Sequence, residues 1–173
     1  RALGRNISGY GNNAFGYDVL NANTTGSHNN ALGSDATMVS NTTGSYNNAL
    51  GISSLNNNIS GSHNNALGYF SLLLNTSGSN NNALGKDTLY GNTSGSNNTA
   101  IGQRAGYNQT TGTSTTYLGA FTNTTDGAVS SSTAIGAGAL LSVSNSMVLG
   151  GTGSNAVNIV SGTSTPWAKF SLM

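Results

Sequence analysis

The sequence of 173 residues contains no cysteine and no glutamate, and it has a single proline. The missing cysteines exclude a disulfide framework and a thiolate metal site. Charged residues make up 5% of the chain, against about 25% in ordinary soluble proteins. A net charge of +1 gives no basic surface for nucleic acid or an anionic membrane. The chain has no run of about 18 apolar residues, so the sequence predicts no membrane span.

Asn, Ser, Thr and Gly take the place of the charged residues, with 25 glycines in all. Such a composition is typical of disordered chains, but here the apolar residues recur at fixed positions. The motif Asn-Asn-Ala-Leu-Gly and its variants return every 17 residues, except for 18 residues between Gly33 and Gly51 and 14 between Gly136 and Gly150. Self-similarity of this period predicts a repeat protein. The motif glycines are Gly16, Gly33, Gly51, Gly68, Gly85, Gly102, Gly119, Gly136 and Gly150.

Two further markers run in phase with the motif. An Asn-Thr-Thr-Gly-Ser segment or a variant of it begins ten residues before the motif glycine, so the extra residue of the 18-residue repeat lies between Gly33 and Asn41. We expect it to form a bulge or a wider turn. A leucine also stands four residues after several motif glycines, at Leu20, Leu55, Leu72, Leu89 and Leu140.

Each repeat therefore has two short apolar spots separated by turn residues, and no stretch has the 3.6-residue periodicity of a helix. This pattern predicts an all-β fold, a parallel β-solenoid of 17-residue coils with two short strands per coil. Equivalent residues of successive coils would stack about 4.8 Å apart, and stacked Asn side chains would hydrogen-bond along the axis. We expect a solenoid domain over residues 1–150 and a capping or linking segment over 151–173, in which Trp167 and Phe170 plug the open end of the core.

The alternation in the motif strand places Leu and Ala on opposite faces. We predict that the larger Leu side chains point into the coil and that the Ala row lies outside. Two buried Leu per coil contribute about 1.5–3 kcal/mol each, whereas ordering a residue costs about 1–2 kcal/mol, so we also expect oligomerisation. The predicted core residues are Leu32, Leu50, Leu67, Leu84, Ile101, Leu118 and Ile135 from the motif, with Leu20, Leu55, Leu72 and Leu89 from the second spot.

Several segments resemble known families. Asn98–Gly102 resembles the head repeat of YadA-like trimeric autotransporter adhesins. The longer unit Tyr90–Gly102 is similar to the repeats that precede endosialidase-type intramolecular chaperone domains in phage tail fibres and bacterial surface proteins, and Thr133–Ala139 and Ser144–Gly150 are similar to the last coils of that family. Gly162–Lys169 resembles the segment that links such repeats to the next domain.

This resemblance implies a left-handed β-roll that forms a homotrimer in an extracellular fibre on a phage, a virion or a cell surface. The sequence departs from it in two ways: its 17-residue coils are longer than the adhesin unit, and the chaperone domain with its self-cleaving residues is absent. The resemblance therefore implies a structural or adhesive role, with a receptor or surface glycan as an outside partner and no protease activity. A self-assembling extracellular filament, or a solenoid that binds ice or glycans, remains an alternative.

Candidate sites are few. Asn-X-Ser/Thr sequons make Asn23, Asn41, Asn58, Asn75 and Asn92 possible glycan acceptors, although Asn and Thr also favour corners for their turn chemistry. The Ser and Thr of the same corners would form a hydroxyl ladder, which is the feature that suggests ice binding.

The residues that could hold a metal are too far apart. His28 and His63 share a repeat position but lie two coils apart, too far for one metal within a chain. Asp18, Asp35 and Asp87 also share a position, where Ser53 and Phe70 interrupt them. We predict no metal site, no cofactor and no catalytic residues, and hence a non-enzymatic protein.

Overall fold

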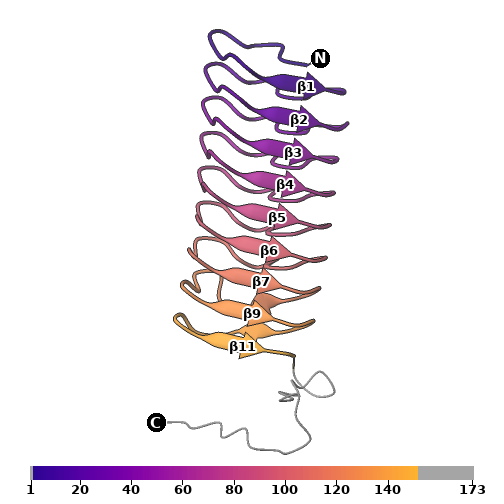
Figure 1. Cartoon of the computed structure of the whole chain (residues 1–173). Helices are drawn as coiled ribbons and strands as arrows, with labels where there is room; N and C mark the ends of the chain where they lie inside the picture. The colour runs from indigo at the N-terminus through magenta and orange to yellow at the C-terminus, as the bar shows by residue number, and fades with distance from the viewer. Residues whose placement is uncertain (1, 152–173) are drawn as a thin grey trace, which may run out of the picture.

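A computed structural model describes residues 2–151 of the chain. These residues form an all-β parallel solenoid whose coils stack along one axis, with the N-terminal coil at one end and β11 at the other (Figure 1). Nine strands make one continuous parallel sheet along the side of the stack, and β8 and β10 form a second, two-stranded sheet. The strands of the long sheet are β1 (Asn13–Phe15), β2 (Asn30–Leu32), β3 (Asn48–Leu50), β4 (Asn65–Leu67), β5 (Asn82–Leu84), β6 (Thr99–Ile101), β7 (Thr116–Leu118), β9 (Thr133–Ile135) and β11 (Met147–Leu149); β8 spans Asn123–Thr124 and β10 spans Leu140–Leu141.

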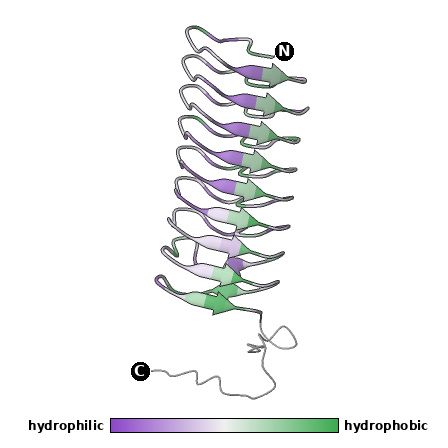
Figure 2. Ribbon diagram, viewed as in Figure 1, coloured by the Kyte–Doolittle hydropathy of each residue, from purple (hydrophilic) through white to green (hydrophobic). Residues whose placement is uncertain are grey.

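Identical motif positions lie directly above one another in the long sheet. In the pairing of β3 with β4, for example, Asn48 is opposite Asn65 and Leu50 is opposite Leu67. Figure 2 shows the result as columns, with polar residues at the start of β1 to β5 and apolar residues at the end of the strands in the long sheet. Each strand's backbone groups thus pair with the coils before and after it, which is how coils with such small interiors are held together.

The predicted second strand of each coil is wrong for most of the chain. Within residues 2–151 it exists only where β8 pairs with β10. In the earlier coils the second apolar spot is a corner, where Leu20, Leu55, Leu72 and Leu89 have positive φ angles of 48–52°. Such left-handed residues cannot continue an extended strand. The four side chains are nevertheless fully buried in the core.

The predicted orientation of the motif strand is also wrong. The alanines at its centre are buried, with Ala31, Ala49 and Ala66 at 0% exposure, whereas Leu32, Leu50 and Leu67 are 45%, 41% and 37% exposed. The motif residues expected inside, Leu32, Leu50, Leu67, Leu84, Ile101, Leu118 and Ile135, thus lie on the outer face of the sheet.

The seventh repeat shows the physical reason for this orientation. There Tyr117 replaces the inward alanine, and Gly106 stands at the position that Leu89 occupies one coil earlier. A Cβ on Gly106 would lie 2.9 Å from Cδ2 of the Tyr117 ring. A coil therefore holds one large and one small side chain, one at the corner and the other at the centre of the motif strand, in keeping with the close packing of protein interiors. A Leu at both positions would not fit.

The extra residue of the 18-residue repeat lies where the spacing places it. Asp35 and Ala36 both have positive φ angles, of 52° and 67°, and Met38 follows as the buried residue of that corner. Met38 donates its backbone N–H to the carbonyl of Ser54, so the coils are back in register. The predicted cap residues Trp167 and Phe170, and the segment assigned to them, lie outside the described residues apart from residue 151.

Candidate functional site

The predicted glycan acceptors form a buried amide column, which we call the inner Asn ladder. Asn58 Nδ2 donates to Asn41 Oδ1 at 2.8 Å and to the carbonyl of Gly61 at 2.9 Å. The same pair of bonds recurs in the neighbouring coils. A glycan on Nδ2 would remove one of these donors and would need space that the coil lacks. The structure therefore contradicts the prediction of glycan acceptors at Asn23, Asn41, Asn58, Asn75 and Asn92, all of them at 0% exposure.

A second buried column runs beside the first one. Asn64 accepts the backbone N–H of Asn81 on its Oδ1 at 3.0 Å, and its own Nδ2 donates to the carbonyl of Gly78 at 2.9 Å. This column comprises Asn29, Asn47, Asn64, Asn81 and Asn98. Because buried amides cost free energy unless all their groups are bonded, both columns fix the axial register of the coils.

One column of corner hydroxyls is bonded within the solenoid. Thr24 Oγ1 donates to the carbonyl of Thr42 at 2.9 Å, and Thr76 Oγ1 donates to that of Thr93 at 3.0 Å. The hydroxyl at this position of the corner thus uses its donor within the solenoid. The next position is exposed in every coil, at Thr25, Thr43, Ser60, Ser77 and Ser94, so the ice-binding alternative stays a prediction.

The two histidines belong to an aromatic column. The rings of Tyr10, His28, Tyr46 and His63 follow one another with centroids 4.9 Å apart. Tyr46 lies between the two imidazoles, so they do not converge on a common point. Within residues 2–151, no group of three or more metal-ligating side chains comes together, and this includes Asp18, Asp35 and Asp87.

The outer face of the long sheet carries a continuous apolar column, the leucine stripe. Its neighbour on the same face is an outer Asn ladder, in which Asn48 Nδ2 donates to Asn65 Oδ1 at 2.7 Å. A shallow hollow of about 200 Å³ lies on this face, between Leu67, Leu84 and Ile101. The stripe consists of Phe15, Leu32, Leu50, Leu67, Leu84, Ile101, Leu118, Ile135 and Leu149, and none of the residues beside it in the strands is charged.

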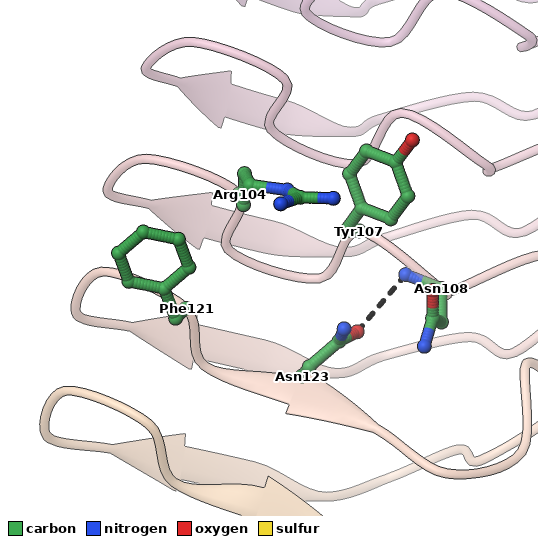
Figure 3. A pocket seen from close by; sticks show the side chains of 5 residues that line it. All are labelled: Arg104, Tyr107, Asn108, Phe121 and Asn123. Carbon is green, nitrogen blue, oxygen red and sulfur yellow. Dashed lines mark hydrogen bonds between the residues drawn. The ribbon is translucent and has the colours of Figure 1, made fainter.

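A second concave site, the corner pocket, lies where the regular repeat breaks down. It has a volume of about 280 Å³ and is lined by Arg104, Tyr107, Asn108, Phe121 and Asn123. Figure 3 shows the Arg104 side chain between the two aromatic rings. The guanidinium carbon lies 4.5 Å from the centroid of the Tyr107 ring, and Asn123 Oδ1 accepts the backbone N–H of Asn108 at 2.9 Å.

The inner Asn ladder ends beside this pocket. Gln109 occupies the next ladder position, but its Nε2 donates to the carbonyl of Val129 at 3.0 Å, and its Oε1 accepts the Tyr117 hydroxyl at 2.6 Å. Asn92 Oδ1 is consequently the one buried side-chain polar atom of residues 2–151 that has no hydrogen-bond partner. Sequence reasoning missed this exchange, although the combined loss of Leu, Asn and Ala from one repeat is its signal.

Burial raises the pKa of Tyr117 well above its usual value, because the phenolate would lose its hydration; a hydrogen bond with Thr124 offsets part of this rise. The unfolded chain ionises this tyrosine near pH 10. The contribution of the neutral phenol to stability is thus fully present below pH 10 and is lost as the pH rises through the interval up to the raised pKa.

We therefore expect the free energy of unfolding to fall above pH 10, by up to about 1.4 kcal/mol per pH unit from this group. Urea unfolding between pH 8 and 11 measures the slope, and Tyr117→Phe is the control because it keeps the ring and removes the ionisable group. Parallel slopes for the two proteins would contradict the assignment.

These features define a parallel β-solenoid repeat protein with an apolar outer stripe and one polar-aromatic pocket. Within the described residues, no helix is long and apolar enough to cross a membrane. No family model, curated protein or solved structure matches the chain.

Proposed function

We infer that the chain is a non-enzymatic segment of an extracellular trimeric fibre, in which three copies pack their leucine stripes together around a common axis. The observation that carries this proposal is the stripe itself. Leu84 is 49% exposed and Leu118 is 43% exposed in the single chain. A continuous apolar column of this kind is typical of a surface that another molecule covers.

The spacing of the stripe favours copies of the same chain as its cover. Its side chains recur once per coil, at the spacing of hydrogen-bonded strands of about 4.8 Å. A partner must present knobs and gaps at that same axial spacing to pack along the whole length, and a parallel copy does so automatically. The absence of charged residues in the strands of this face removes like-charge repulsion between the copies.

The threefold arrangement, the left-handed coil and the place on a phage, virion or cell surface come from the resemblance of Tyr90–Gly102 and the later repeats to fibre and adhesin repeats. In such a fibre the solenoid supplies length and stiffness, and its corners face outward toward a receptor. The two buried Asn columns suit this role, because they hold each coil to the next without charged groups.

Leu67→Asp tests the proposal. We expect the wild-type chain to have three times the mass of one chain in light scattering, and the variant to lose this assembly, because a carboxylate would be desolvated in the centre of the interface. Ile59→Asp is the matched control, since Ile59 is an exposed apolar residue (48%) on a corner away from the stripe. It should leave the mass unchanged.

Three outcomes would decide against the trimer. A monomeric wild type would contradict it directly. Equal effects of Leu67→Asp and Ile59→Asp on the mass would show that the assembly does not depend on the leucine stripe. A broad distribution of large masses, seen as open-ended rods in electron microscopy, would replace the fixed trimer by a filament.

A further inference from the structure

The corner pocket contains an arginine whose hydrogen-bonding edge has no partner. Arg104 makes no ion pair within the described residues. It is one of five Lys and Arg residues in the chain. Its guanidinium carbon lies over the Tyr107 ring, 4.5 Å from the centroid. None of its side-chain N–H groups has a hydrogen-bond partner within residues 2–151, and these are the groups that bind a carboxylate in a two-pronged arrangement.

The remaining lining residues add an apolar surface and amides. Phe121 is 52% exposed on the other side of Arg104 from Tyr107 (Figure 3). Asn123 uses its Oδ1 to accept the Asn108 N–H, and its Nδ2 remains available as a donor. The pocket thus combines a cation, a flat apolar ring and an amide donor around one cavity.

The size of the cavity suits a single small ring. A volume of about 280 Å³ lies just below the range of about 300–1,000 Å³ of pockets for drug-sized ligands. A pyranose has an apolar C–H face that packs on an aromatic ring and hydroxyls that accept from amides. A carboxylate on the same ring would meet the free edge of Arg104.

We propose that the corner pocket binds a carboxylate-bearing sugar unit, with its acid on Arg104, its apolar face on Phe121 and its hydroxyls at Asn123. Asp87 works against this binding. It stands at the same corner position one coil earlier, two residues after its motif glycine as Arg104 is, and its charge repels the ligand acid. The pocket shares no residue with the leucine stripe.

The test uses the full chain and two probes, methyl β-glucuronide and methyl β-glucoside, titrated while ring and amide signals are followed by NMR. We expect the glucuronide to shift the Tyr107 and Phe121 signals with a Kd of about 1–10 mM, as suits a small ligand in an open site. The glucoside, which lacks the acid, should bind at least about ten-fold more weakly, because the guanidinium edge would stay unpaired.

Three variants separate a built site from general attraction of anions. Arg104→Gln should abolish saturation, whereas Lys86→Gln, which removes the same charge from outside the pocket lining, should weaken binding by no more than about two- to five-fold, the general effect of one nearby charge. Asp87→Asn should tighten binding by about two- to five-fold, as expected from removing one nearby like charge in a partly aqueous setting. Equal binding of both probes, equal effects of Arg104→Gln and Lys86→Gln, or no saturable shift up to 50 mM glucuronide (about five times the upper expected Kd) would each overturn the proposal.

Discussion

Replacing Asn58 by aspartate is expected to lower the free energy of unfolding by about 3–5 kcal/mol at pH 7, the range for an uncompensated buried charge. The substitution keeps the shape of the side chain but turns the donor Nδ2 into an acceptor. That atom then faces Asn41 Oδ1 and the Gly61 carbonyl, both of which are acceptors at hydrogen-bonding distance. No Lys or Arg is among the buried residues of the part of the chain that the structure describes, so no buried cation offsets the charge.

Urea unfolding followed by circular dichroism at one protein concentration measures this loss. Asn57→Asp is the control, because Asn57 is a half-exposed neighbour outside the ladder, where surface substitutions change stability by about 0.5 kcal/mol or less. The defect of Asn58→Asp should shrink in acid, since burial favours the neutral carboxyl, which can donate one hydrogen bond. If the two variants unfold at the same urea concentration, the inner Asn ladder does not stabilise the solenoid.

The ladder also explains why the Asn-Thr-Thr-Gly-Ser segment repeats so strictly. The glycine of each such segment approaches the next coil closely: a Cβ on Gly61 would lie 2.3 Å from the Gly78 carbonyl oxygen and 2.5 Å from Asn58 Oδ1. The asparagine therefore needs its glycine three residues later, both as a hydrogen-bond acceptor and as the space for the amide. The sequence pattern that looks like a glycosylation sequon is in this fold the signature of a buried corner.

The period of the repeat was sufficient to predict the solenoid and the stacking of equivalent residues. Spacing also located the extra residue between Gly33 and Asn41, because two independent markers bracket it. These properties depend on the order of residues along the chain alone. They need no knowledge of how wide a coil is inside.

The direction of the motif strand could not be obtained in that way. Alternation shows that Ala66 and Leu67 point to opposite sides, and hydrophobicity ranks Leu as the more buried type. The interior volume decides otherwise, since the corner leucine of the same coil, Leu55, is already fully buried inside it. Two buried Asn columns occupy much of the remaining interior, although composition alone would place these asparagines on the surface.

The corner pocket was also outside the reach of the repeat pattern. One lining residue, Asn123, stands where the leucine marker fails, and Gly106, next to the lining residue Tyr107, interrupts the same column. Their meaning depends on side chains from two successive coils that come together. A search for positions where several markers fail in one repeat would have directed attention to residues 102–124.

The exchange of large and small side chains in the seventh repeat gives the second large expected effect. Tyr117→Ala should lower the free energy of unfolding by about 3–5 kcal/mol, because it leaves a ring-sized cavity between Gly106 and the opposite wall. Gly106→Leu alone should cost about 1–3 kcal/mol through overpacking against Tyr117. The double variant restores the Leu and Ala pair of the preceding coils, so its loss should be smaller than the sum of the two by about 2–3 kcal/mol.

Adding Gln109→Asn to the double variant should recover further stability, because the new Nδ2 can donate to Asn92 Oδ1, the atom now without a partner. In the wild-type background the same change should instead destabilise, since the Tyr117 hydroxyl would lose its acceptor. Urea unfolding of all the variants at one concentration gives the coupling. If the losses of the two single variants simply add, the side chains at positions 106 and 117 do not compete for the same interior space. The orientation of the motif strand, with Ala inside and Leu outside, would then lack its physical cause.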